Sequence, residues 1–165
     1  MYVIWKAVHV FAVVLFLGNI ITGVFWAQLA HKTRDPKNIA LTFEGITRSD
    51  RWFTMPGVTL LTFAGIGNAM IAGIPMLGTG WIFWSIVLLI VSGAAFMFRV
   101  SPLQRRIAAL ARAAGSGQFD WARYELLHRS WALWGSIATL APLVAMVLMV
   151  LKPELPGLRM MISPN

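Results

Sequence analysis

His9 is the residue of this sequence best placed to do chemistry, because it lies well inside the first of four long apolar segments. A titratable side chain at hydrocarbon depth is costly, so it usually has a function or a partner. Neutral imidazole is also the commonest metal ligand among side chains. The sequence therefore predicts that His9 is an axial ligand of a haem or a ligand of a copper ion. The alternative is a neutral core histidine that is hydrogen-bonded to a neighbouring helix.

Of six further side chains predicted to lie at the depth of His9, which include Leu88 and Met149, four are candidates for a cofactor site. They are Asn68 and Met70 in the second apolar segment, Trp84 in the third and Met146 in the fourth. Methionine is a plausible sixth ligand of haem and a soft ligand of copper(I), although it also commonly fills gaps in apolar cores. The predicted cofactor site consists of these five residues, with His9 as the metal ligand, haem b as the first cofactor and copper as the alternative.

The other polar residues exclude several chemistries. His31 and His128 both fall at the membrane boundary farther from His9. About 22 helical residues, or roughly 33 Å, separate His9 from His31. Neither His31 nor His128 can therefore share a haem with His9. They could meet each other. Asn19 and Asn68 are expected to form hydrogen bonds between helices. No carboxylate is expected inside a span, which leaves a proton-coupled pump without its usual relay, and the absence of cysteine excludes thiolate ligands.

These side chains require membrane-spanning helices to position them. The 165 residues are 58% hydrophobic and only 12% charged, about half the charged fraction of a soluble domain. Apolar segments cover about 3–30, 53–73, 81–100 and 131–151, and each can cross about 30 Å of hydrocarbon as a helix. The sequence predicts an all-α fold: a single integral membrane four-helix bundle over 1–165. The first segment is too long for a cleaved signal peptide and has no A-x-A site.

The basic residues predict an orientation. Eleven of the fourteen Lys and Arg residues fall in the first and third connections, counting the adjoining helix ends, and the second connection has none. The positive-inside rule then places both termini outside the cytoplasm of a bacterial inner membrane. The connections are expected to continue the spans as helices into the cytoplasm, or to lie along an anionic inner leaflet. Since loop positions account for the net charge of +8, nucleic acid is not expected as a partner.

Local signals define the helix ends in these connections. Asp35-Pro36 and Asp120 are expected to begin helices, with Phe119 and Tyr124 as a hydrophobic staple, and Ser116-Gly117 to interrupt one. Further expectations are a buried face made by Ile39, Phe43 and Ile46, a Glu44–Arg48 pair, and kinks at Pro56 and Pro142. A weak repeat, in which Arg51, Gly57 and Met70 match Arg129, Gly135 and Met149, is consistent with two related hairpins.

Several short motifs follow one another along nearly the whole chain. They are Lys6-x-x-His9, Leu17-Gly18-Asn19, Pro56-Gly57-Val58, Gly65, Pro102-Leu103-Gln104-Arg105 and Trp131-x-x-Trp134-Gly135. In their order they resemble a bacterial family of predicted integral membrane proteins, domain of unknown function 2269, whose name implies no activity. More distantly, a histidine in the first span of a small bundle is similar to the copper-resistance D and haem-binding protoporphyrinogen-oxidase-like membrane proteins. The acidic and basic ligands of their later spans have no secure counterpart here, so this likeness implies only that His9 is a ligand candidate.

Three functions remain open at this point. The first is haem b or metal binding through His9, in electron transfer or redox sensing. The second is a cofactor-free accessory or assembly subunit in which His9 and the asparagines hold the bundle together, either as a homo-oligomer or within a larger membrane complex. The third is copper handling. The sequence assigns no enzymatic activity.

Overall fold

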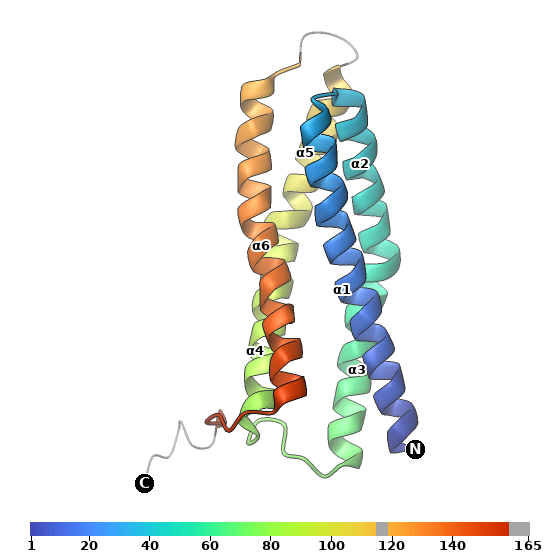
Figure 1. The fold of residues 1–165 in the computed structure, drawn as a ribbon, viewed down its shortest axis with the longest axis vertical. Helices are drawn as coiled ribbons and strands as arrows, with labels where there is room; N and C mark the ends of the chain where they lie inside the picture. Colours follow the sequence, from blue (N-terminus) through green and yellow to red (C-terminus); the bar gives the residue numbers. More distant parts are fainter. Residues whose placement is uncertain (115–118, 159–165) are drawn as a thin grey trace.

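Four long helices form two antiparallel hairpins (Figure 1). The computed structural model describes residues 1–114 and 119–158. The first hairpin contains α1 (Tyr2–Thr33) and a second long helix made of α2 (Pro36–Ser49), the π-helical turn η1 (Asp50–Thr54) and α3 (Met55–Ile71). The second hairpin contains α4 (Gly80–Ala95), the π-helical turn η2 (Phe96–Val100) and α5 (Ser101–Ala113), followed by α6 (Trp121–Leu151). The predicted all-α fold is confirmed, and all four long helices are long and apolar enough to cross a membrane.

The two ends of the molecule differ in charge. At one end, here called the terminal end, lie the N-terminus, the connection from α3 to α4 and the end of α6 (Figure 1). At the other, the basic end, α1 turns into α2 and α5 is followed by α6. The helices continue well past the apolar segments toward the basic end, as the sequence predicts. Thus α1 reaches Thr33, and α2 carries the second helix back to Pro36.

Predicted caps produce the helix ends at the basic end. The Asp35 carboxylate accepts a hydrogen bond from the backbone N–H of Lys37 (3.0 Å), with Pro36 at the first helical position. Asp120 likewise accepts from the N–H of Arg123 (2.9 Å), and the expected staple places the rings of Phe119 and Tyr124 5.7 Å apart. These contacts satisfy N–H groups that the first helical turn leaves without partners. The predicted break at Ser116-Gly117 lies outside the described residues.

Prolines explain the two π-helical turns. Proline lacks an N–H, and its ring displaces the carbonyl four residues earlier. Ahead of Pro56 the helix widens instead of breaking, so that the N–H of Met55 donates to the carbonyl of Asp50. Ahead of Pro102 the N–H of Ser101 donates to the carbonyl of Phe96 in the same way. Pro56 therefore produces a π turn at the expected place, whereas Pro142 lies inside the unbroken helix α6.

Packing is closest within each hairpin and at the basic end. The helix α1 packs along α3, and α4 along α6, whereas the two hairpins meet mainly through α2 and α5. This interface contains the largest fully buried side chains of the described residues, Ile39, Phe43, Ile107 and Tyr124. The predicted face made by Ile39, Phe43 and Ile46 is therefore confirmed. At the rim of the same interface, Glu44 pairs with Arg112 of α5 (2.6 Å) and not with the expected Arg48.

Candidate functional site

His9 is bonded to the neighbouring helix of its own hairpin. Its Nδ1 lies 2.8 Å from the carbonyl oxygen of Leu61 in α3. Since a carbonyl can only accept, Nδ1 carries the proton and the lone pair of the ring is on Nε2. The side chain is half-buried. One polar atom of the imidazole is thus used to join α1 to α3, as in the alternative that the sequence leaves open.

The contact between α1 and α3 is a seam of bulky side chains facing glycines. A Cβ atom at Gly57 would lie 3.2 Å from Cβ of Phe16, and one at Gly65 would lie 3.1 Å from Cε1 of His9. At Gly67 it would lie 2.9 Å from the ring of Trp5. Glycine allows membrane helices to approach closely. His9 is therefore one of three large side chains of α1 that fit against the glycines of α3, and we call these six residues the α1–α3 seam.

None of the other residues of the predicted cofactor layer forms a hydrogen bond with His9 in the described part of the chain. Asn68 lies on α3 beyond Gly65, with a buried Oδ1 that has no hydrogen-bond partner among the described residues. Met70 is 72% exposed and Met146 is 39% exposed, while Nε1 of Trp84 donates to the carbonyl of Pro156 (3.2 Å). Depth alone does not bring these side chains together, because α3 has little contact with α4 or α6. Within residues 1–114 and 119–158, no three His, Asp or Glu side chains are grouped as metal ligands.

A buried carboxyl group lies elsewhere in the first hairpin, where the sequence predicted none. Asp50 is only 8% exposed and belongs to the helix Pro36–Ile71, the second candidate span. Asp50 lies three residues before the predicted span 53–73, on the same unbroken long helix, and is nevertheless buried in the bundle. The reason is the continuity of α2, η1 and α3. Because no loop separates the basic connection from the span, Asp50 is carried into the bundle on the first residue of η1.

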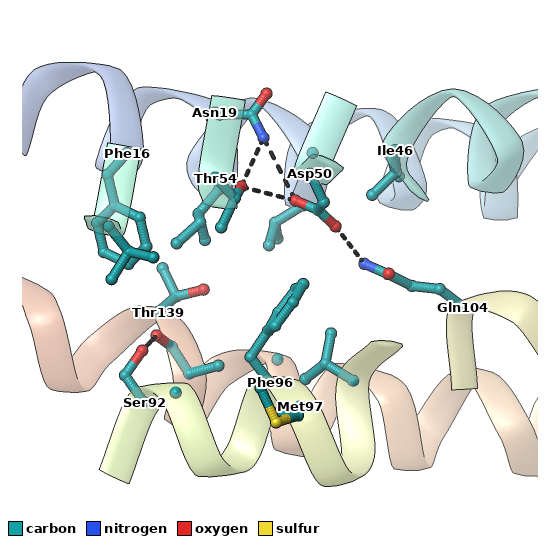
Figure 2. A pocket seen from close by; sticks show the side chains of 18 of the residues that line it. Phe16, Asn19, Ile46, Asp50, Thr54, Ser92, Phe96, Met97, Gln104 and Thr139 are labelled. Atoms are coloured by element: carbon teal, nitrogen blue, oxygen red, sulfur yellow. Dashed lines mark hydrogen bonds between the residues drawn. The ribbon is translucent and has the colours of Figure 1, made fainter. Parts of the chain in front are cut away.

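Three neutral donors surround the Asp50 carboxyl group (Figure 2). Its Oδ1 accepts from the hydroxyl of Thr54 (2.8 Å) and from Nδ2 of Asn19 (3.3 Å), and its Oδ2 accepts from Nε2 of Gln104 (3.1 Å). Asn19 also donates to Thr54 Oγ1 (2.8 Å) and accepts from the hydroxyl of Ser49 (3.0 Å). The prediction that Asn19 bonds between helices is confirmed. We call these five residues the Asp50 cluster; through Gln104 it joins the two hairpins.

A cavity of about 160 Å³ lies between the hairpins beside this cluster. Figure 2 shows Asn19, Asp50 and Thr54 on one side of it and Ser92, Phe96 and Thr139 on the other. Most of its wall is apolar, and aromatic rings from both hairpins contribute to it: Phe16, Phe96 and Trp131. We call this space the inter-hairpin cavity.

Three buried polar atoms on the wall of this cavity have no hydrogen-bond partner among the described residues. They are Oε1 of Gln104, Nε1 of Trp131 and Oγ1 of Thr139. Gln104 and Trp131 are 3% and 2% exposed, so these atoms are not satisfied by bulk solvent. Buried polar groups in proteins are nearly always paired with protein, water or ligand. The residues of the wall therefore carry two acceptors and two donors without partners among the described residues, counting the hydroxyl as both, beside a carboxyl group.

Comparison with known proteins identifies the family. A family model described as "predicted integral membrane protein", domain of unknown function 2269, matches residues 3–153. The chain belongs to this family. No curated protein and no solved structure matches the sequence, so the distant similarity to copper-resistance D proteins is not shown.

The motifs of the family resemblance can now be located in the structure of this domain of unknown function 2269 protein. His9, Gly57 and Gly65 lie in the α1–α3 seam, and Asn19 and Gln104 belong to the Asp50 cluster. The Trp131-x-x-Trp134-Gly135 motif places Trp131 and Gly135 on the wall of the inter-hairpin cavity. The motifs therefore mark the contacts within and between the hairpins.

The two remaining histidines of this family member meet at the basic end. The rings of His31 and His128 are stacked with centroids 4.0 Å apart and an interplanar angle of 6°. Nδ1 of His31 lies 3.1 Å from the hydroxyl of Tyr124, and Nε2 of the buried His128 has no partner among the described residues. The sequence left open whether His31 and His128 contact each other, and in the structure their rings do.

Proposed function

We propose that this protein is a multi-pass membrane protein that binds a small ligand in the inter-hairpin cavity, at the Asp50 cluster. One observation carries the proposal: the cavity is lined by a buried carboxyl group and by three residues that each hold a buried polar atom without a partner among the described residues. Ionisable side chains inside membrane bundles usually mark functional sites. Cavities that are partly polar hold water or ligand, whereas empty ones are apolar.

Filling the cavity tests this function. A Cβ atom at Gly135 would meet nothing within 4 Å, so Gly135→Leu adds a side chain on the cavity wall without a backbone clash. Gly18 likewise has open space around it and is exposed, which makes Gly18→Leu the matched control. Thermal unfolding in mild detergent is followed with a panel of benzene-sized alcohols, amides and amines. Panel members are expected to stabilise the wild type and Gly18→Leu but not Gly135→Leu; equal effects on all three would contradict the proposal.

Haem b or copper binding at His9 is the second candidate function. The hydrogen bond from Nδ1 to Leu61 favours it, because a backbone carbonyl that accepts from one ring nitrogen commonly orients a ligating imidazole and leaves Nε2 for the metal. Within the described residues no three His, Asp or Glu side chains are grouped as metal ligands, so His9 stands as a single imidazole and the ligand set is incomplete. Purification in mild detergent tests the proposal. A Soret band or bound copper that is lost in His9→Ala would support it, and a colourless, metal-free protein would overturn it.

The membrane orientation is a separate proposal. Concentration of Lys and Arg at the basic end supports a cytoplasmic basic end near the anionic inner leaflet of a bacterial inner membrane. The chain contains no cysteine, so a single cysteine can be introduced at Lys37 or Leu77 and labelled with a membrane-impermeant maleimide in intact cells. Labelling at Leu77 and protection at Lys37 are expected; the opposite pattern would reverse the orientation.

An accessory role in a larger assembly is the third candidate. It rests on the hydrogen bond from His9 to Leu61 and on the packing of His9 against Gly65, neither of which requires a cofactor. Light scattering in detergent would report whether copies of the chain associate, and a monomer throughout would contradict a homo-oligomer.

A further inference from the structure

Asp50 has no cationic partner within the described part of the chain. The two ion pairs in residues 1–114 and 119–158, Arg34–Glu125 and Arg112–Glu44, both lie at the basic end. Burying an uncompensated charge in a low-dielectric interior is very costly. Three hydrogen-bond donors favour the carboxylate form, yet they supply no positive charge. Either a bound proton or a cation must therefore neutralise this group.

The charged residues of the surrounding elements point elsewhere. Arg48 and Arg51, on the helix of Asp50, are exposed, as are Arg99 of η2 and Arg105 of α5. The guanidinium of Arg99 lies 5.2 Å from the ring centroid of Trp134. From α1 the facing group is the neutral amide of Asn19, and the α6 side chains on the cavity wall, Trp131 and Thr139 among them, are uncharged. The described residues therefore place no positive charge beside Asp50, and a cation there would have to be a bound species.

The size and the wall of the cavity restrict this species. Its volume of about 160 Å³ is close to that of an engineered apolar cavity of roughly 150 Å³ that binds benzene. The rings of Phe16, Phe96 and Trp131 line it, and aromatic faces attract cations. Two lining residues, Met55 and Met97, are 39% and 62% exposed, so the cavity extends toward the lipid-facing surface of the bundle.

We propose that the inter-hairpin cavity binds a small organic ammonium ion, with the charged group paired with Asp50 and an apolar body of about the size of a benzene ring against the aromatic wall. An ammonium group has three donors. The residues of the wall include the Asp50 carboxylate and two acceptors without partners among the described residues, Oε1 of Gln104 and Oγ1 of Thr139. This inference rests on the proposed ligand-binding function and adds the charge and chemical class of the ligand.

Two sources can supply an ammonium group in a membrane: a free amine, or the headgroup of phosphatidylethanolamine. The wild-type protein is therefore placed in nanodiscs of phosphatidylglycerol alone and of phosphatidylglycerol mixed with phosphatidylethanolamine. Benzylammonium is the probe and benzyl alcohol its neutral counterpart of nearly equal size, with binding measured by equilibrium dialysis. If the lipid headgroup is the natural occupant, benzylammonium binds more weakly in the mixed nanodiscs; if a free amine is, both nanodiscs give the same affinity.

The variant Asp50→Asn removes the charge and keeps the size of the side chain. Asp120→Asn is the matched control, because it makes the same change at an exposed cap where Asn serves equally well. Wild type and Asp120→Asn are expected to bind benzylammonium at least about tenfold more tightly than benzyl alcohol, and Asp50→Asn is expected to lose this preference. Because a proton on Asp50 competes with the ammonium ion, binding should also weaken as the pH falls.

Each outcome has a distinct meaning. Equal binding of the two probes by the wild type, lost in Gly135→Leu, would overturn the ammonium inference and leave the ligand-binding function standing. A preference for benzylammonium that survives in Asp50→Asn would also overturn the inference. Failure of every probe in the cavity would overturn both proposals. Circular dichroism of Asp50→Asn checks that the variant is folded, and unaltered binding of benzyl alcohol by it shows that the cavity is intact.

Discussion

Substitution of alanine at the seam glycines should reveal which contacts between α1 and α3 are rigid. A Cβ atom at Gly57 would lie 3.2 Å from Cβ of Phe16 and 3.4 Å from its backbone N and Cα. These atoms cannot move aside unless the two helices separate. At Gly67 the nearest atoms, at 2.9 Å, belong to the ring of Trp5, which is 38% exposed and can rotate. Gly67→Ala should therefore destabilise the protein less than Gly57→Ala, although its Cβ would make the shorter contact.

The magnitudes follow from two opposing effects. Replacing glycine by alanine within a helix gains about 1 kcal/mol of helix propensity, and Gly18→Ala, with nothing within 4 Å of its Cβ, should show this gain alone. Overpacking costs about 1–3 kcal/mol. Gly57→Ala should therefore lower the free energy of unfolding by about 1–2 kcal/mol relative to Gly18→Ala, whereas Gly67→Ala should lose less than about 1 kcal/mol on the same scale.

Unfolding in mixed micelles of mild detergent and SDS, followed by circular dichroism, measures these differences. Double variants separate the two kinds of contact. Trp5→Ala should remove the cost of Gly67→Ala, but Phe16→Ala should not rescue Gly57→Ala, because alanine retains the Cβ that is in the way. A Gly57→Ala variant as stable as Gly18→Ala, or rescue by Phe16→Ala, would refute the close approach of the helix backbones at this point.

The same unfolding assay tests four further substitutions. His9→Phe keeps a ring against α3 and loses the hydrogen bond to Leu61, so a loss of about 1 kcal/mol is expected; no loss would mean that the bond contributes nothing. Asp50→Ala leaves buried donors without an acceptor and should cost about 2–3 kcal/mol, more than Asp50→Asn. Asp120→Ala removes a helix cap and should cost about 1 kcal/mol. Glu44→Gln, at a half-exposed ion pair, should change stability by less than about 1 kcal/mol, and a larger effect would show that the α2–α5 interface depends on this charge.

Local signals in the sequence predicted the helices and the two hairpins, but not which side chains of the two hairpins meet. Caps at Asp35 and Asp120 depend on side chains within three residues of the helix start, so they can be recognised without the fold. The cofactor layer was a different kind of prediction, since equal depth in the membrane does not determine which helices are neighbours. Met70 and Met146 lie on helices of different hairpins, and those helices have little mutual contact.

The Asp50 cluster was missed for a specific reason. The apolar segment was predicted to begin near residue 53, and the polar residues ahead of it were assigned to a connection. Asn19 in the first span and a proline six residues after Asp50 were the available signals, because a proline within a continuous helix favours a π-helical turn that re-orients the preceding residues. No sequence pattern indicated that Gln104, 54 residues further along, donates to this carboxyl group.

Because Gln104 belongs to the second hairpin, the Asp50 cluster is complete only after both hairpins have been inserted and have packed together. The first hairpin precedes the helix that carries Gln104 in the chain, so it can enter the membrane before that helix does, and at that stage Asn19 and Thr54 serve only Oδ1 of Asp50. Oδ2 obtains its donor when α5 docks against α2. Until then only one oxygen of the Asp50 carboxyl group has donors, so the hairpin alone is expected to be a better substrate for membrane quality-control proteases than the completed chain. A nascent chain that stops in the connection at 72–79 should therefore be short-lived, and co-expression of the second hairpin should prolong its life.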